Sequence, residues 1–328
     1  MPDAPGPSTS EVPLRDAATV MLVRDAADGR GAGIEVFMLL RNLKSDFVGG
    51  AYVFPGGAVD PEDRHENLDP VCVGRSDAHA SEQLGIDQGG LAFWVAAVRE
   101  CFEEAGVLLA TGPDGELVDF SDPELDQRFQ IHRKAVDSRA RRLVEICEEE
   151  QLQLAVGEMY YFSHWITPEG APRRYDTRFF VTRAPVGQVP LHDSRETIAN
   201  VWIRPADALA QHRAGSFDLI FPTMRSLMAL ERFSSADEVI AAAAAIQDVP
   251  AILPKIIEDA SGYRILLPGD PGFDEAFPVV LPEGVPMNKL RMQGTGDEGA
   301  RGGGARETVG ADEGPTVRAD GAGGDDGA

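Results

Sequence analysis

The stretch AVRECFEEAGVLLA, Ala97–Ala110, places three glutamates and one arginine inside a run of small and apolar residues. In a helix, residues three and four positions apart share a face, so Glu100, Glu103 and Glu104 crowd together on one side. The other side of the helix is apolar and carries Trp94, Val98, Cys101, Ala105 and Leu108. The stretch therefore predicts a helix with one face for a hydrophobic core and one concentrated carboxylate face.

A solvated amphipathic helix is the simplest interpretation, but it leaves a cost unexplained. Like charges at positions i and i+4 repel each other, and Glu100 and Glu104 have only Arg99 nearby to compensate. Mg²⁺ or Mn²⁺ would reverse that cost, because these hard cations take oxygen ligands. Arg99 lies one turn before Glu103, so it can pair with a carboxylate and fix its orientation. We therefore interpret the helix as a platform for a divalent metal, with Glu100, Glu103 and Glu104 as candidate ligands.

The charge of the chain argues against one class of partner. Its 328 residues carry a net charge of -24, from 54 acidic and 30 basic residues. Such an excess of acidic residues disfavours binding of nucleic acid through a basic face. It does not disfavour a small anionic substrate, because a bound divalent metal inverts the local sign of the charge.

The cysteines and the N-terminal segment bear on the compartment. Cys72, Cys101 and Cys147 are far apart without C-x-x-C spacing, so neither a disulfide framework nor a structural zinc site is expected. Residues 1–13 lack the basic start and apolar core of a signal peptide. No apolar run approaches the roughly 20 residues of a membrane span. We therefore expect a soluble, cytoplasmic protein with no membrane partner.

The pattern of apolar residues predicts a mixed α/β fold. Runs rich in β-branched and aromatic residues predict strands over 17–25, 33–41, 51–54, 159–168, 174–184 and 196–205, with a last strand and turn over 262–277. Helical patterns cover 91–110, 122–151 and 205–215 and resume at residue 223. Since strands and helices interleave without a strict βαβ rhythm, we expect a mixed sheet between helices and not a doubly wound parallel sheet.

Two segments of the chain resemble the two halves of the Nudix box. RECFEEAGV, Arg99–Val107, is similar to its second half, R-E-U-x-E-E-x-G-U, in which U is a bulky apolar residue. FPGGAVD, Phe54–Asp60, is similar to the glycine turn that opens the box. Asp63 stands where the box has a glutamate, and Arg99 follows about thirty residues later than in an uninterrupted box. The resemblance therefore implies a Nudix hydrolase with an insertion inside the box.

The insertion narrows the resemblance to one branch of the family. The branch that includes a peroxisomal coenzyme A diphosphatase has an interrupted box, and FVGGAYVFPGG, SHWITP and RRYDTRFFV are also similar to it. The resemblance covers residues 17–209. It implies an α/β/α sandwich over 14–210, with an inserted loop at about 61–90. We expect a helical C-terminal extension over 211–291, and disorder in 1–13 and in the acidic, glycine-rich tail 292–328.

The resemblance also implies a reaction and a metal site. Nudix enzymes hydrolyse the diphosphate bridge of a nucleoside diphosphate linked to another moiety, with divalent ions on the diphosphate oxygens. Carried over residue by residue, Glu103 and Glu104 are the main ligands of Mg²⁺ or Mn²⁺, Glu100 is a further ligand and Arg99 orients them. The backbone around Gly56 and Gly57 would help to complete the site.

The catalytic base has two candidates in later segments of the chain. In several family members an acidic residue from a later loop binds metal or takes the proton of the attacking water. Glu196, shortly before the strand VWIRP, is in a suitable place, and Asp176 in RRYDT is its rival. An ordinary loop carboxylate is an equally open interpretation of Glu196.

The residues that contact the substrate are expected among arginines and aromatic residues. Guanidinium groups grip phosphate through two hydrogen bonds, which favours Arg173 and Arg174 and then Arg41 as phosphate contacts. Adjacent arginines at the start of a strand are also compatible with a solvated surface. Three aromatic residues either stack on a base or belong to the core: Tyr52, Phe54 and Trp165.

The substrate and the rival functions stay open on the sequence alone. Coenzyme A or an acyl-coenzyme A, cut to 3′,5′-ADP and a phosphopantetheine, is the first expectation; ADP-ribose, a nucleotide-sugar or a dinucleoside polyphosphate are the alternatives. A catalytically silent Nudix-fold regulator is a further alternative, but such a protein should have lost box carboxylates, and all three remain. A homodimer is also left open.

Overall fold

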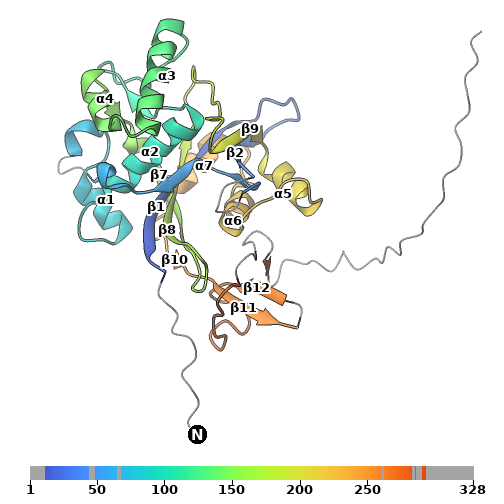
Figure 1. Ribbon diagram of the computed structural model, residues 1–328. Helices are drawn as coiled ribbons and strands as arrows, with labels where there is room; N and C mark the ends of the chain where they lie inside the picture. Colours follow the sequence, from blue (N-terminus) through green and yellow to red (C-terminus); the bar gives the residue numbers. More distant parts are fainter. Residues whose placement is uncertain are drawn as a thin grey trace, which may run out of the picture. The chain divides into compact units, whose positions relative to one another are not determined.

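The computed structural model describes residues 12–43, 49–64, 68–260, 262–282, 285 and 290–292, and Figure 1 shows its elements. Nearly all of the two terminal segments predicted to be disordered lie outside these residues. The central feature is a mixed sheet in which β10, β7, β8, β1, β2 and β3 follow one another, with β4 paired to β1 and β9 to β2. The strands are β1 Leu14–Asp25, β2 Ile34–Arg41, β3 Tyr52–Val53, β4 Gly56–Ala58, β7 Tyr160–Ile166, β8 Arg174–Arg183, β9 Thr197–Ile203 and β10 Ala251–Ile252.

Strand β1 is the centre of the fold because it is buried on both faces. It pairs in parallel with β8 along ten positions and antiparallel with β2 and β4. Its side chains alternate between two cores, with Val20 and Leu22 in one and Met21 and Val23 in the other. A strand buried on both faces explains why the sequence shows a continuous apolar run here and no polar alternation.

Helices cover both faces of the sheet. On one face α2 Leu91–Ala105 packs on β1 and β4, together with α1 Asp77–Leu84, α3 Pro123–Asp137 and α4 Leu143–Glu149. The other face is covered by α5 Pro205–Arg213, α6 Phe221–Leu230 and α7 Ala236–Ala244. Figure 1 shows α1–α4 apart from α5 and α6, with the strands between the two groups. The predicted mixed sheet between helix layers is confirmed.

The insertion is not the loop that the sequence suggested. It forms two short 3₁₀ turns, Pro61–Asp63 and Asp69–Val71, and the helix α1, whose Ala80 and Leu84 are buried in the core beside α2. Only two turns of helix are present, so the apolar period is too short to be recognised in the sequence.

Helix α1 supplies the N-terminal cap of α2. The carboxylate of Asp77 accepts hydrogen bonds from the backbone N–H of Gly89 at 3.0 Å and of Leu91 at 3.0 Å, and Ser81 Oγ accepts from Gly90 N–H at 2.9 Å. The first N–H groups of a helix have no partner within the helix, so these acceptors satisfy the N–H of Leu91 and those of the two glycines that lead into α2. The insertion therefore helps to fix the start of the helix that carries the box glutamates.

We expect Asp77→Ala to lower the free energy of unfolding by about 1–2 kcal/mol, because the half-buried N–H of Gly89 and the N–H of the buried Leu91 lose a charged acceptor. Urea denaturation followed by circular dichroism would measure the change. The matched control is Asp87→Ala, at an exposed aspartate in the same segment, which should change the stability by less than about 0.5 kcal/mol. An equal loss in both variants would contradict the capping role.

The C-terminal extension is helical only in its first half. Helices α6 and α7 are followed by β10 and by a separate small sheet of β11 Lys255–Asp259, β12 Gly262–Leu266 and β13 Arg291–Met292. Pro250 and Pro254 interrupt any helix after α7, and the isoleucines between and after them favour strands. The strand predicted from residue 262 is present. Leu227, Leu230 and Val239 share a core with β1 and β8, so the extension belongs to the same folded body as the sheet.

None of the helices in the described segments combines the length and the apolar character that a membrane span requires.

Candidate active site

Helix α2 presents its carboxylate face to β4, in which Gly56 and Gly57 pair with β1 as a strand where the sequence suggested a turn. The helix ends at Gly106, which has φ 68° and lets the backbone turn away in the left-handed region. The other face of α2 is completely buried. Glu100, Glu103 and Glu104 line the same pocket as Gly56 and Gly57, and Gly56 N–H donates to Glu104 Oε2 at 3.0 Å. The two halves of the interrupted box therefore meet in space.

The two glycines are required by close approach. A Cβ on Gly57 would collide with the carboxylate of Glu100, and one on Gly56 would lie 2.6 Å from the carbonyl oxygen of Ala18 on β1. A side chain at Gly56 would push β4 away from the backbone of β1, whereas one at Gly57 would displace the carboxylate of Glu100. Glycine here brings the backbone of β4 against the carboxylates.

Arg99 connects the parts of the site. Its guanidinium is 8% exposed and forms a two-pronged ion pair with Asp63, with Nε to Oδ1 and Nη2 to Oδ2 both at 2.9 Å. Nη2 also donates to the carbonyl oxygen of Ala58 at 2.8 Å, and Nη1 donates to Glu100 at 2.9 Å and Glu103 at 3.2 Å. One side chain thus holds the insertion, β4 and two box glutamates together.

Burial keeps these carboxylates unusually basic. The pKa of Glu100 is raised to about 7, first by loss of hydration and then by the charge of Glu103, although Arg99 opposes both. Burial also raises the pKa of Glu103, and that of Glu104 well above its usual range, with the charge of Glu100 adding to the rise at Glu104. The ionised forms of these carboxylates are therefore disfavoured without metal, and a bound cation would favour them.

The donor atoms suit a hard divalent cation by their kind. Three carboxylates on one helix face open into one pocket, which is the ligand type that Mg²⁺ and Mn²⁺ take. Within the described segments, however, no three acidic, histidine or cysteine side chains already form a cluster ready for a metal. Glu100 and Glu103 are turned to Arg99, and Glu104 to Gly56. Binding an ion would require these side chains to rotate towards the pocket, as long Glu side chains can.

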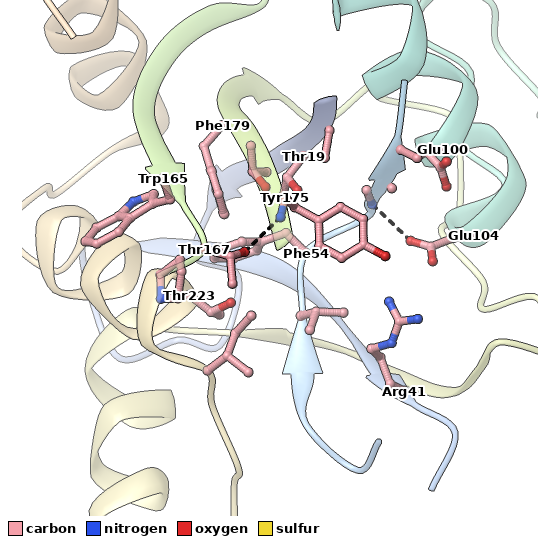
Figure 2. A pocket seen from close by; sticks show the side chains of 18 of the residues that line it. Thr19, Arg41, Phe54, Glu100, Glu104, Trp165, Thr167, Tyr175, Phe179 and Thr223 are labelled. Atoms are coloured by element: carbon pink, nitrogen blue, oxygen red, sulfur yellow. Dashed lines mark hydrogen bonds between the residues drawn. The ribbon is translucent and has the colours of Figure 1, made fainter. Parts of the chain in front are cut away.

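The pocket has a volume of about 450 Å³ and gathers many of the residues predicted to act. Its lining includes the α2 face and both glycines, and from other elements Arg41, Arg173, Glu196, Phe54 and Trp165. Figure 2 shows Glu100, Glu104 and Arg41 at one end of it and Trp165, Phe179 and Thr223 at the other. Tyr52 stacks on Phe217 with ring centroids 3.6 Å apart, in the core arrangement left open from the sequence.

Strand alternation separates the candidates on β8. Arg173, Tyr175, Thr177 and Phe179 line the pocket, whereas Asp176 pairs with His164 and Arg178 on the opposite face. The pKa of Asp176 is lowered because His164 and Arg178 outweigh its partial burial. Arg174 donates from Nε to the carbonyl oxygen of Thr167 at 3.2 Å. The structure therefore does not bring Asp176 or Arg174 to the pocket wall.

Glu196 lies on a loop that Asp193 orders. Asp193 accepts hydrogen bonds from the backbone N–H of Glu196 at 2.9 Å and of Thr197 at 2.8 Å. The side chain of Glu196 is 54% exposed, and its charge contributes to the raised pKa of Glu104. The loop therefore presents an accessible carboxylate across the pocket from the α2 face.

Arg133 on α3 is a residue that the sequence analysis missed. It is 8% exposed, and its Nε donates to the carbonyl oxygen of Glu103 and its Nη2 to that of Leu191, both at 2.9 Å. Leu191 N–H in turn donates to the carbonyl oxygen of Ala105 at 2.9 Å. Arg133 thus ties the end of α2 to the loop of Glu196. In the sequence it is one of many charged residues in a polar helix, so no pattern distinguishes it.

We expect Arg133→Met to lower the free energy of unfolding by about 1–3 kcal/mol, because the carbonyl oxygens of Glu103 and Leu191 lose a charged donor while the apolar stem is kept. Arg128→Met on the same helix is the matched control, because that side chain is 54% exposed, and it should cost less than about 1 kcal/mol. Guanidinium denaturation curves would measure both changes. Similar losses in the two variants would exclude the bracing role of Arg133.

The chain is similar in sequence to a protein family and to named proteins. The family described as the NUDT19 Nudix domain matches residues 70–230. A Gallus gallus protein named acyl-coenzyme A diphosphatase NUDT19 is 28% identical over 306 residues, which cover 80% of this chain and 80% of that protein. Its Homo sapiens counterpart is 28% identical over 277 residues, covering 73% and 72%.

A solved structure supports the same grouping. The crystal structure of a NUDIX hydrolase from Alicyclobacillus acidocaldarius superimposes with a TM-score of 0.59 and 26% sequence identity. The alignment covers 71% of this chain and 97% of that one. The shared architecture therefore extends well beyond the box.

Proposed function

The chain belongs to the Nudix hydrolase family, and on this premise we propose that it uses Mg²⁺ or Mn²⁺ to hydrolyse the diphosphate bridge of coenzyme A or an acyl-coenzyme A. Water would attack one phosphorus of the bridge, the bridging P–O bond would break, and 3′,5′-ADP and a phosphopantetheine would leave. The observation that carries the proposal is the meeting of Glu100, Glu103 and Glu104 with the Gly56–Gly57 turn in one pocket.

The box glutamates would hold the metal. When bound, divalent ions neutralise the diphosphate oxygens and activate the attacking water. Glu103 and Glu104 are the proposed main ligands, with Glu100 beside them. Without metal, Arg99 Nη1 pairs with Glu100 and Glu103 and Gly56 N–H donates to Glu104, so each carboxylate is kept beside the pocket into which it would rotate to bind an ion. Arg99 is itself immobilised by Asp63, so it acts as a positioning residue.

Glu196 is the proposed base for the attacking water. It faces the same pocket as the α2 carboxylates and remains open to solvent. Asp193 holds its backbone, and Arg133 ties the preceding part of the loop to α2. A general base must lie within hydrogen-bonding reach of the attacking water. A loop held by Asp193 and by Arg133 can keep the Glu196 carboxylate in one position at the pocket. Asp176, the rival candidate, is engaged on the other face of β8.

Arg41 and Arg173 are the proposed phosphate contacts. Both line the pocket; Arg41 lies near the carboxylate end (Figure 2), and Arg173 immediately precedes β8. Guanidinium groups match the geometry of phosphate oxygens and stay charged at any physiological pH. Coenzyme A carries three phosphate groups, so two arginines at the pocket wall suit such a ligand.

The substrate is tested by a panel assayed with Mg²⁺ and with Mn²⁺. We expect coenzyme A and its thioesters to yield 3′,5′-ADP, with kcat/KM at least about tenfold above that for ADP-ribose, a nucleotide-sugar or a dinucleoside polyphosphate. Chromatography of the products would identify the bond that is cut. Cleavage of ADP-ribose without 3′,5′-ADP from coenzyme A would overturn the substrate, and no turnover on any member would favour the regulator.

Glu103→Gln is expected to lower kcat by roughly a hundredfold or more, because a neutral amide replaces a charged ligand while the shape is kept. The same substitution should reduce the rise in Tm that Mg²⁺ or Mn²⁺ causes in the native protein. The Tm without metal should stay within a few degrees of the native value. Glu148→Gln, at an exposed glutamate of α4, is the control and should behave as the native protein. Full activity of Glu103→Gln would contradict the metal site.

A further inference from the structure

The pocket has two chemically different ends. One end is formed by the carboxylates of α2 with Arg41, and the other by aromatic and aliphatic side chains (Figure 2). The apolar end includes Phe54, Trp165 and Phe179, which are 2%, 6% and 5% exposed, and therefore rigidly packed. A diphosphate bound over α2 would leave the remainder of a long substrate to extend along this wall.

The outer part of the apolar wall comes from the C-terminal extension. Phe221 is the first residue of α6 and meets Trp165 of β7 edge to face, with ring centroids 5.4 Å apart and an angle of 83° between the rings. Ile265 of β12, 4% exposed, and the buried Pro254 complete the lining. The sheet and α2 supply the catalytic end, whereas the extension closes the distal end with apolar atoms.

Charge decides which part of the substrate each end suits. Arg139 and Arg195 line the pocket together with the carboxylates of α2. Arg139 pairs with Asp60 and Arg195 with Asp137, each at 2.8 Å. Asp60 itself lies 3.9 Å from Arg99. An anionic nucleotide finds guanidinium groups there. The other end is walled mainly by aromatic and aliphatic side chains, with the uncharged hydroxyl groups of Thr167 and Thr223 among them, which suits an uncharged chain.

Trp165 supplies a second observation. Its indole Nε1 is buried and has no hydrogen-bond partner among the described parts of the chain. A buried donor without an acceptor costs free energy, and a bound carbonyl group would satisfy it. Pantetheine and a thioester carry such carbonyl groups next to an apolar chain.

We propose that Phe221, Ile265 and Trp165 form the subsite for the acyl chain of the substrate, so that the C-terminal extension sets the chain-length preference. The inference rests on the proposed hydrolysis of coenzyme A derivatives and adds to it the residues that select among them. Each methylene buried against this wall contributes to binding, so kcat/KM should rise with acyl length until the cavity is full.

The test compares thioesters of coenzyme A with two, four, eight and twelve carbons. In the native protein kcat/KM should rise from the two-carbon to the eight-carbon ester. Two variants remove apolar surface with residue types that suit their positions: Phe221→Ser at the start of a helix and Ile265→Thr in a strand. In both, the ratio of kcat/KM for the eight-carbon ester to that for the two-carbon ester should fall about tenfold. Met228→Ser on the outer side of α6 is the matched control, since Met228 is 39% exposed and outside the pocket. Its ratio should equal the native one.

Calorimetric titration of the same esters without metal separates this inference from the proposed function. If the native protein cleaves no ester but binds longer ones more tightly through Phe221, the proposed hydrolysis fails and the subsite stands. If hydrolysis occurs with a ratio that is independent of acyl length, or with equal losses for all esters in both variants, the subsite is overturned. Equal losses that extend to ADP-ribose would place the nucleotide at the apolar end.

Discussion

The ion pair between Arg99 and Asp63 is the interaction on which the candidate site depends. A single buried guanidinium joins the 3₁₀ turn of the insertion, the carbonyl of β4 and two glutamates of α2. Buried charges are costly unless every donor and acceptor is satisfied, and removing one partner of such a pair leaves the other uncompensated. The four partners of Arg99 meet this requirement. The same contact therefore closes the glycine turn onto the helix and sets the positions of the carboxylates.

The interrupted box shows how a motif can tolerate a long insertion. Asp63 lies at the start of the insertion and Arg99 after it, and their contact brings the two halves of the box together. The insertion packs α1 against α2 and caps its first N–H groups through Asp77 and Ser81. It therefore replaces a short connection with a folded support. At the opposite end of α2, Arg133 donates to the carbonyl oxygen of Glu103 and to that of Leu191 in the segment before Glu196, so side chains from other elements contact both ends of the helix.

Electrostatic strain and metal binding are two aspects of the same arrangement. Burial raises the pKa values of all three carboxylates, and neighbouring acidic groups add to the rise: Glu103 at Glu100, Glu100 at Glu104, and Asp137 and Asp63 at Glu103. The fold accepts this cost because Arg99 and the N–H of Gly56 offset part of it. A divalent ion would offset more of the cost of burying these charges. Folding therefore places the carboxylates where binding of an ion is favourable. The apolar end of the pocket has no such strain, in keeping with a role in binding the uncharged part of a substrate.

The sequence by itself determined the carboxylate helix, the glycine turn, the mixed sheet and the correspondence of Asp63 with the box. These features depend on local periodicity and on motif residues, which are visible along the chain. Tertiary structure alone decided that α1 caps α2, that the extension turns from helices to strands at the pocket, and that Arg133 braces the Glu196 loop. It also assigned the face of β8, since a strand alternates its sides every residue and only pairing shows which side meets the pocket. Contacts between residues distant in sequence arise from packing of the whole chain, and no local pattern encodes them.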